Sequence, residues 1–471
     1  MALNTIVTRY ELSKIFSPTD LTSWESAAKD APQSIASRMV LNLTSSLENF
    51  LYRPGQDRMF DRGVLESTPD QPTALLQGFL AERAEEVGEF ELLEAGGFGA
   101  KLDSFAFNVD NKLSWIKELS SVLVNREEKI PYNEVRDRFG WFGSFFNYWR
   151  MIRPHPWLDD ASTDEVPNRF RVAILGDWAT GMYGAPISAK SIHNDPAGFN
   201  AVIHLGDIYY AGAEKEVKNS FLPFWPRPQG AYLRALNANH EMLTGGHGYF
   251  NFVLPSFKQT ASFFAFVNDY WILAGLDTAY AAKWNVFSDG KLTADQVSWL
   301  KYLVKLHKDK KLILFSHHYP FSLVGWHGRR KSLKPQKSVL FRQLNDFLRE
   351  DKIFAWYWGH EHRCLLYEKD MRGGYYGRCV GHGGFPYDRD RSTYVTSSPA
   401  RSIAGGVSWR LLTGHSLMPD GLLLDGPNPY VPPAPDDFGT QGYMSIELDD
   451  MHINEVVHLP DGHVVYSKLL I

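Results

Sequence analysis

The sequence predicts an α/β protein preceded by a mostly helical region, and two observations support this prediction. From about residue 166 onward, short apolar runs alternate with helical patterns, which is typical of an α/β domain. Before residue 165, apolar residues instead recur at helical spacing. Because 471 residues are too many for one ordinary domain, we expect a helical N-terminal domain over 1–165 and an α/β domain over 166–471.

The N-terminal region carries apolar stripes over residues 35–51, 73–87 and 113–123, each of which predicts a helix with one buried face. Two prolines and an acidic stretch, together covering residues 154–165, are expected to link this region to the α/β domain. The sequence does not indicate a partner or a role for the N-terminal domain.

The α/β region contains five apolar runs that predict strands and one pattern over 293–306 that predicts a helix. A long stretch over 386–439 is rich in Pro, Gly, Ser and Asp, so we expect a loop-rich insertion there that is a lid, a binding element or a disordered segment. The chain should close with a β-meander. The expected strands are 172–175, 201–205, 270–276, 311–315 and 353–357, followed by 443–448, 455–459 and 464–470.

Composition excludes several classes of protein. The formal net charge of -5 argues against a general nucleic-acid binder, which would carry a basic face. The two cysteines, Cys364 and Cys379, are too few for a disulfide scaffold and are expected to be reduced thiols. No stretch approaches the ~20 apolar residues that cross a bilayer. The first 16 residues lack the apolar core of a signal peptide, so a cytoplasmic location is expected.

Five short clusters of metal-ligating side chains follow one another along the α/β region. Most come directly after an apolar run, so their side chains should emerge where buried strands end and meet at one edge of a sheet. Carboxylate, phenol, amide and imidazole groups suit a pair of transition or borderline metals. The clusters are Gly176-Asp177-Trp178, Gly206-Asp207-Ile208-Tyr209-Tyr210, Asn239-His240-Glu241, His317-His318-Tyr319-Pro320 and Gly359-His360-Glu361-His362.

Each cluster also has an ordinary structural explanation. A Gly-Asp pair after a strand is often only a turn, and many histidines simply satisfy local hydrogen bonds. The order of the clusters and their shared position after strands favour a metal site. Because neighbouring side chains on extended backbone point in opposite directions, His317 and His318 should not both ligate, and neither should both Tyr209 and Tyr210.

The clusters resemble the ordered motifs of the calcineurin-like metallophosphoesterases, and within them the purple acid phosphatases, especially the small mammalian type. The matching motifs are Gly-Asp-Trp, Gly-Asp-x-x-Tyr, Asn-His-Glu, His-Tyr-Pro and Gly-His-Glu-His. The resemblance covers residues 168–386 and the terminal strands, but not residues 1–165 or 386–439. It implies a β-sandwich flanked by helices, in four layers ordered α-β-β-α.

The resemblance also implies two metal ions held by seven residues. The first ion, ferric iron in the family, would be held by Asp177, Asp207, Tyr210 and His362. The second ion, divalent iron, zinc or manganese, would be held by Asp207, Asn239, His318 and His360.

Three positions refine this assignment. Many metallophosphoesterases have histidine where this chain has Ala179, and the resemblance implies that Tyr210 supplies the missing ligand. The match to His-Tyr-Pro favours His318 as a ligand and leaves His317 to support it. Tyr209 is then expected to be a packing residue.

The resemblance implies a dinuclear metal hydrolase of small phosphate esters, with a phosphomonoesterase as the preferred activity. A hydroxide activated by both metals would attack phosphorus in line with the leaving oxygen. His240 would protonate the leaving group, and Glu241 would orient His240 or raise its pKa. The alternatives are a phosphodiesterase acting on nucleotides or other small diesters, and a non-catalytic metal-binding scaffold. A nuclease is disfavoured because no basic run lies near the clusters.

Overall fold

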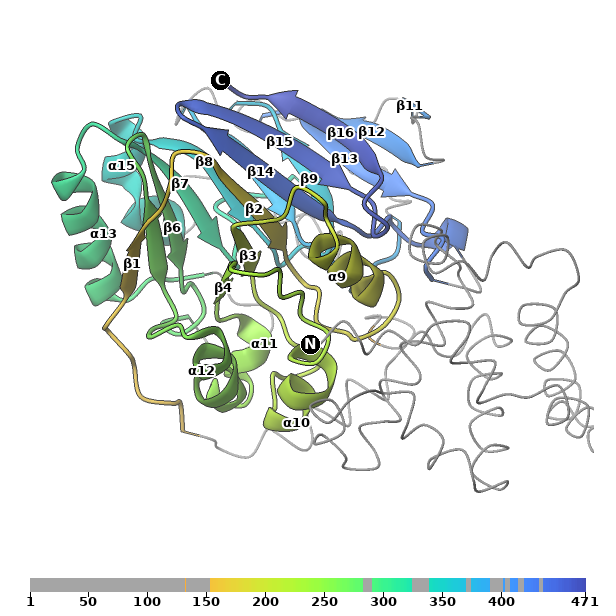
Figure 1. Ribbon diagram of the computed structural model, residues 1–471, viewed down its shortest axis with the longest axis horizontal. Helices are drawn as coiled ribbons and strands as arrows, with labels where there is room; N and C mark the ends of the chain where they lie inside the picture. The colour runs from red at the N-terminus through yellow and green to blue at the C-terminus, as the bar shows by residue number, and fades with distance from the viewer. Residues whose placement is uncertain are drawn as a thin grey trace, which may run out of the picture.

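The computed structural model describes residue 132 and residues 153–282, 290–323, 339–369, 374–389, 401–402, 407–413, 419–431 and 435–471. The N-terminal helices expected over residues 35–51, 73–87 and 113–123 lie outside the described residues. In the described part, two β-sheets pack face to face, and helices cover both outer faces (Figure 1). The four layers implied by the resemblance are therefore confirmed.

The larger sheet is mixed, and its central strands β6, β7, β8 and β10 run parallel. The carboxyl ends of these strands therefore lie at one edge. In spatial order the sheet contains β1 (Ser162–Glu165), β5 (Phe264–Val267), β6 (Trp271–Leu276), β7 (Lys311–Ser316), β8 (Ile353–Trp358), β10 (Tyr376–Val380), β9 (Cys364–Tyr367), β13 (Gly421–Gly426), β12 (Ser408–Leu412) and β11 (Arg401–Ser402).

The smaller sheet combines the terminal meander with three parallel strands, β2, β3 and β4. Along β2, Val172 and Ile174 face the layer between the sheets, whereas Ala173 and Leu175 pack toward the outer helices. Burial on both faces explains why this strand reads as an unbroken apolar run. The spatial order is β16 (Val464–Leu469), β15 (His452–His458), β14 (Tyr443–Asp449), β2 (Phe170–Leu175), β3 (Ala201–His204) and β4 (Tyr232–Ala235).

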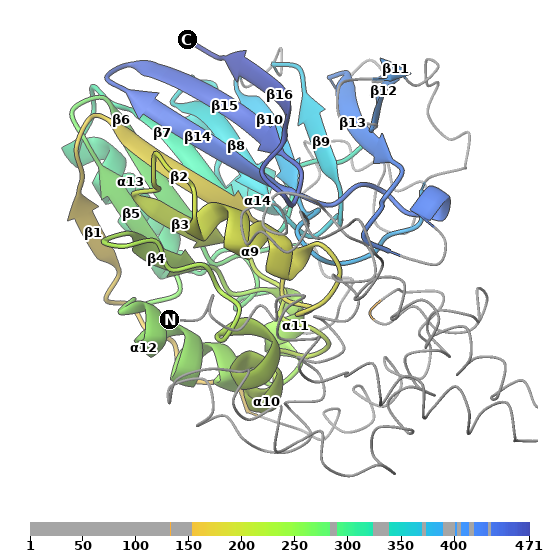
Figure 2. The ribbon, with the colours of Figure 1, turned by 45° about the vertical axis from the view of Figure 1, so that its right-hand side comes forward.

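Helices cover both sheets (Figure 2). The helix expected at 293–306 is α13, which begins after Thr293, whose hydroxyl accepts a hydrogen bond from the Gln296 N–H. With α13 (Ala294–Leu306), the larger sheet carries α14 (Val339–Gln343) and α15 (Asn345–Arg349). The smaller sheet carries α9 (Ala185–His193), α10 (Glu214–Glu216), η4 (Val217–Phe221), η5 (Tyr249–Val253) and α12 (Leu254–Phe257); α11 (Asn239–Met242) and η8 (Pro435–Asp437) lie in loops.

Two segments differ from expectation. The acidic end of the expected linker is strand β1, which pairs with β5 and so belongs to the larger sheet. Within 386–439, strands β12 and β13 form an antiparallel hairpin that joins the same sheet through β9. This hairpin was not expected, because only one short apolar run, 422–424, stands out in a segment rich in turn residues.

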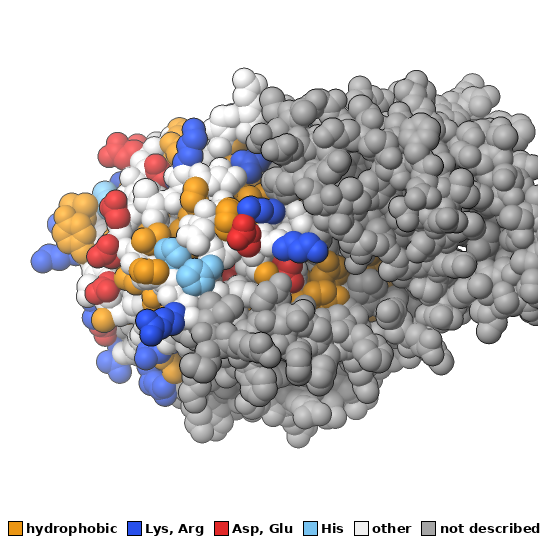
Figure 3. Space-filling view, turned by 90° about the horizontal axis from the view of Figure 1, so that it is seen from below, with side chains coloured by type: hydrophobic (Ala, Val, Ile, Leu, Met, Phe, Trp, Pro, Cys, Tyr) orange, Lys and Arg blue, Asp and Glu red, His pale blue; other side chains and the backbone are white. Residues whose placement is uncertain are grey.

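The surface of the described part is mixed in charge. On the face seen from below in Figure 3, acidic and basic side chains of the described residues are interspersed. This pattern is typical of a solvated surface. Among the described residues, no helix has the length and apolar character needed to cross a membrane.

A buried ion pair joins the two sheets. Arg378 on β10 donates from Nη2 and Nε to the Glu455 carboxylate on β15 at 2.6 and 2.8 Å, and both side chains are fully buried. The second terminal nitrogen of Arg378 donates to the carbonyls of Tyr367 and Gly377 at 2.6 and 2.8 Å. The Tyr357 hydroxyl donates to Glu455 at 3.4 Å. The pair is therefore compensated by charge and by hydrogen bonds, as burial requires.

Replacing Arg378→Met should lower the free energy of unfolding by about 3–5 kcal/mol, because the Glu455 carboxylate would remain buried without its cation. The double variant Arg378→Met/Glu455→Leu should regain most of this loss, because neither charge remains. Urea denaturation of the full chain measures both effects. A double variant as unstable as the single variant would show that the cost is a packing defect.

Candidate metal centre

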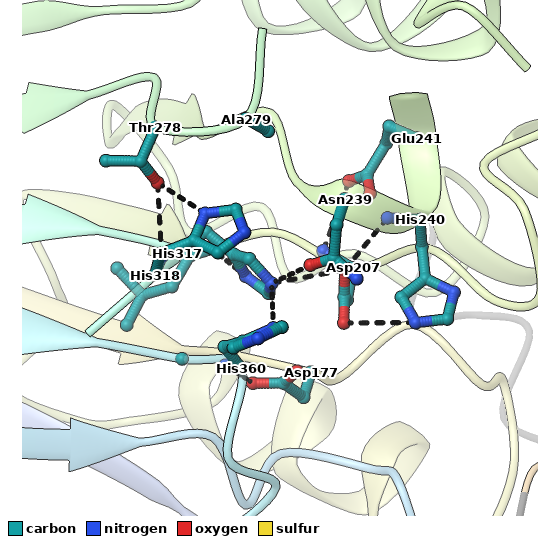
Figure 4. Close-up of polar contacts among 12 residues, drawn as sticks. Asp177, Asp207, Asn239, His240, Glu241, Thr278, Ala279, His317, His318 and His360 are labelled. Atoms are coloured by element: carbon teal, nitrogen blue, oxygen red, sulfur yellow. Dashed lines mark hydrogen bonds and ion pairs between the residues drawn. The ribbon is translucent and has the colours of Figure 1, made fainter. Parts of the chain in front are cut away.

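The five clusters converge at the carboxyl ends of parallel strands from both sheets. Figure 4 shows side chains from separate loops turned toward a common centre. Each cluster follows its own strand within a few residues. Asp177 follows β2, Asp207 follows β3, Asn239 follows β4, His317 and His318 follow β7, and His360 and His362 follow β8.

Four of the predicted ligands have left-handed backbone. The φ angles are 55° at Asp177, 74° at Asp207, 70° at His360 and 54° at His362. Such a conformation is uncommon outside glycine and costs about 1–3 kcal/mol per residue. Gly206 has φ 104°, and a Cβ there would lie 2.6 Å from the Ala238 Cβ, so the residue before Asp207 must be glycine. Strain concentrated at these residues supports a functional site.

The first group of ligand atoms contains two carboxylates, an imidazole and a phenol. The Tyr209 hydroxyl lies 3.1 Å from Asp177 Oδ1, 3.2 Å from Asp207 Oδ2 and 3.0 Å from His362 Nε2. The His362 Nε2 lies 3.4 Å from Asp177 Oδ1. Asp177, Asp207 and His362 can each direct one atom to a shared metal ion.

The structure reverses the roles expected for the two tyrosines. The Tyr210 hydroxyl accepts a hydrogen bond from the Tyr132 N–H at 3.1 Å, and the two rings stack at 4.6 Å. Tyr209, expected to be a packing residue, instead brings its hydroxyl into the first group. Strand alternation does not apply here, because β3 ends at His204 and the left-handed Asp207 turns the loop before the tyrosines.

The second group is centred on the His317 Nε2 atom. This nitrogen lies 2.7 Å from Asn239 Oδ1, 3.1 Å from His360 Nδ1 and 3.3 Å from Asp207 Oδ1. Burial lowers the pKa of His317 well below its ordinary value, so the ring is neutral at neutral pH. Its Nδ1 lies 3.0 Å from the Leu205 carbonyl, and we assign the single ring proton to this hydrogen bond.

The position of the His317 ring proton decides whether a metal ion fits between these residues. With the proton on Nδ1, the Nε2 atom of His317 presents a lone pair toward two oxygens that are themselves acceptors. Acceptors that face one another without a proton are satisfied by a cation. The residues present therefore fit a metal ion.

His318 lies beside the same group. Its Nδ1 is 2.8 Å from the Thr278 hydroxyl, and its Nε2 is buried without a hydrogen-bond partner among the described residues. Burial lowers the pKa of His318 to about 3, so this ring is also neutral. His317, His318 and His360 can each offer one nitrogen to a common ion. His317 therefore offers a candidate ligand nitrogen of its own, in addition to His318. Both side chains can face the same centre because β7 ends at Ser316, so the alternation of side chains along a strand does not apply to them.

Asp207 connects the two groups. Its Oδ2 faces the Tyr209 hydroxyl of the first group, and its Oδ1 faces His317 of the second. The Asp177 carboxylate is fully buried nearby, and its pKa is raised well above the ordinary value by burial and by the negative charge of Asp207. Two buried carboxylates this close need positive charge between them to ionise together.

His240 and Glu241 begin helix α11 and are buried. The His240 Nδ1 donates to the Tyr210 carbonyl at 2.6 Å, and its Nε2 lies 3.7 Å from Asp207 Oδ2. The Glu241 carboxylate accepts from the Asp207 N–H at 3.2 Å. The His240 ring is thus oriented by the Tyr210 carbonyl, whereas the sequence analysis assigned this role to Glu241. Glu241 instead stabilises the loop that contains Asp207.

Two supporting residues were missed at the sequence level. Thr278 holds His318, and Ser322 donates to the Glu361 carboxylate between the two histidine ligands of its loop. The Trp358 indole also donates to Glu361, at 2.9 Å. Thr278 follows the end of strand β6, just as each cluster follows the end of its own strand. This position is the one sequence signal that could have identified Thr278.

In the metal-free protein, Asp177→Asn should be more stable than the unchanged chain at neutral pH. The stabilising contribution of a group with a raised pKa is complete below its unfolded pKa, near 3.8 for Asp177, and is lost as the pH rises through the folded pKa. The advantage of the Asn variant should therefore be near zero at a pH of about 4 and grow as the pH rises. Thermal unfolding of both proteins with a chelator present measures this difference.

Protonation of the histidines that do not contact Asp177 affects both proteins equally and cancels in the comparison. Divalent metal should reverse the order of stability, because the Asn variant has lost a charged ligand. A stability gap that stays constant across this pH range would contradict the assignment of Asp177.

Comparison with known proteins supports this reading of the site. Residues 170–364 match the model of the calcineurin-like phosphoesterase family, and this stretch includes all five clusters. The resemblance to that superfamily is therefore confirmed. No curated protein matches the chain.

Three solved structures are similar to parts of the chain. A purple acid phosphatase from seeds of yellow lupin (Lupinus luteus) is 16% identical with a TM-score of 0.44, over 67% of this chain and 55% of that one. The chain thus spans about half the length of that phosphatase. GAP50, the anchor in the inner membrane complex of Plasmodium, is 16% identical with a TM-score of 0.40, over 64% and 88%. A predicted phosphoesterase from Streptococcus pneumoniae is 11% identical with a TM-score of 0.25, over 64% and 97%.

Proposed function

We propose that this chain, which belongs to the metallophosphoesterase superfamily through its domain at 170–364, is a phosphomonoesterase with two metal ions. One observation carries the proposal. Two groups of ligand atoms share the Asp207 carboxylate, and in one of them the lone pair of His317 faces the oxygens of Asp207 and Asn239. Paired metal sites bridged by a carboxylate are suited to phosphoryl transfer.

The residues divide between the two sites as follows. Asp177, Asp207, His362 and Tyr209 would hold one ion, and Asp207, Asn239, His360 and His317 would hold the other, with His318 beside it. When bound, the ions would lower the pKa of a water and stabilise negative charge on the phosphoryl oxygens. The buried carboxylates and neutral imidazoles hold these positions before any substrate arrives.

His240 is the proposed acid for the leaving group. Because its Nδ1 proton is donated to the Tyr210 carbonyl, Nε2 is the nitrogen that can carry and release a second proton. The Asp207 Oδ2 atom lies 3.7 Å from this nitrogen. His240 would thus bind a phosphate oxygen and protonate the departing alkoxide.

Purified protein supplied with divalent metal should hydrolyse p-nitrophenyl phosphate. His240→Gln should lower kcat for an alkyl ester such as glycerol phosphate by about 10²–10⁴-fold, because an alkoxide must be protonated as it leaves. The variant removes the proton donor but not a proposed ligand, so metal analysis should be unchanged. His247→Gln is a matched control, because that histidine is hydrogen-bonded to the Arg153 carbonyl away from the site. A chelator should abolish activity in both variants.

Two outcomes would contradict this function. Faster hydrolysis of bis(p-nitrophenyl) phosphate would favour the diesterase alternative. Absence of turnover on both esters, with metal bound, would favour a non-catalytic scaffold.

The phenol beside Asp177 supports ferric iron in the first site, as in the purple acid phosphatases. If ferric iron binds there, the protein should absorb broadly in the visible, and Tyr209→Phe should lose this band. Tyr210→Phe is the matched control and should keep it, because the Tyr210 hydroxyl bonds to Tyr132. A coloured Tyr209→Phe protein would remove Tyr209 from the ligand set.

A further inference from the structure

Arg363 is a buried cation beside the candidate metal centre. It directly follows the ligand His362 and is 8% exposed. Its Nε and Nη1 atoms are buried without a hydrogen-bond partner among the described residues. Burying a guanidinium is unfavourable unless its charge and its hydrogen bonds are satisfied.

The other arginines of this kind in the described part of the chain are compensated. Arg378 is fully paired with Glu455. The buried Arg234 is paired with Asp164 at 2.7 Å, although its Nε also has no hydrogen-bond partner among the described residues. The less buried Arg389 and Arg410 share the buried Asp425 carboxylate at 2.6 and 2.8 Å. The fold thus provides carboxylates where arginines are structural. Arg363 forms no ion pair with a carboxylate among the described residues. The buried Glu361 carboxylate is close enough to sense its charge, but it accepts its hydrogen bonds from Ser322 and Trp358. The two unpartnered nitrogens of Arg363 therefore indicate an anion that arrives from solution.

The position of Arg363 relates it to the metal centre. The loop after β10 presents Phe385 and Tyr387, two residues apart. The His362 ring stacks on Phe385 at 3.8 Å, and the Arg363 guanidinium lies 5.3 Å from the centre of the Tyr387 ring. His362 and Arg363 thus contact two aromatic rings of the same loop, which places the guanidinium beside the candidate metal centre.

We propose that Arg363 binds a second anionic group of the substrate, carboxylate or phosphate, next to the phosphoryl group that is hydrolysed. This inference rests on the proposed function and narrows its substrate class to phosphate esters that carry another negative charge. Guanidinium is well suited to both oxyanions, and the Tyr387 face keeps its plane fixed.

The test compares two esters that differ only in the second charge, glycerol phosphate and phosphoglycerate, both esterified at the terminal carbon. Wild-type protein should prefer phosphoglycerate through a lower KM. In Arg363→Met, KM for phosphoglycerate should rise about 30-fold or more, because a buried charge pair is lost. KM for glycerol phosphate should be unchanged. Arg363→Lys keeps the charge and should restore part of the preference.

Two further measurements separate this role from a structural one. Without ligand, Arg363→Met should have a melting temperature equal to or above that of the wild type, because an uncompensated charge is removed. Phosphoglycerate should stabilise the metal-loaded wild type more than glycerol phosphate does, and the variant should lose this difference. Arg389→Met is the matched control, since it removes a paired arginine and should keep the substrate preference.

The outcomes are distinguishable. If the wild type hydrolyses no ester, the proposed function fails, and the thermal shifts still decide whether Arg363 selects an anion. If kcat falls equally for both esters in Arg363→Met, the guanidinium contacts the reacting phosphoryl group and the second-anion inference is wrong. Equal KM values for both esters in the wild type would also overturn it.

Discussion

The burial of two carboxylates of like charge at one point is the constraint on which the rest of the structure depends. Asp177 and Asp207 are fully enclosed, and the Tyr209 hydroxyl contacts both of them. Without positive charge between them, one carboxylate must stay protonated, which is why the pKa of Asp177 is raised. The left-handed loops and the neutral histidines around them are arrangements that a bound cation would make more favourable.

The sandwich provides the rigidity that such an arrangement needs. Parallel strands in both sheets end at the same edge, so each ligand is fixed by a strand that is buried on both faces. The Arg378–Glu455 pair ties one sheet to the other across the inner layer. Sites supported on strands keep their geometry better than sites held by loops alone.

The sequence was sufficient for the fold class and for the position of the five clusters after buried strands, because unbroken apolar runs identify those strands. It failed for adjacent residues of one type. Choosing between Tyr209 and Tyr210, or between His317 and His318, requires the backbone path beyond the last strand residue, where left-handed turns replace alternation. Arg363 could not be identified from the sequence either, because what distinguishes it is that two of its buried nitrogens have no hydrogen-bond partner among the described residues.

Tyr132, which precedes the sandwich in sequence, contacts the candidate site through Tyr210. Its N–H bonds to the Tyr210 hydroxyl, and the Tyr210 carbonyl in turn holds the His240 ring. A protein fragment that starts at residue 153 would keep every strand described above, yet the aromatic face of Tyr210 would lose its stacking neighbour and be open to water. Tyr132 is therefore part of the surroundings of the candidate site, although it precedes the sandwich in sequence.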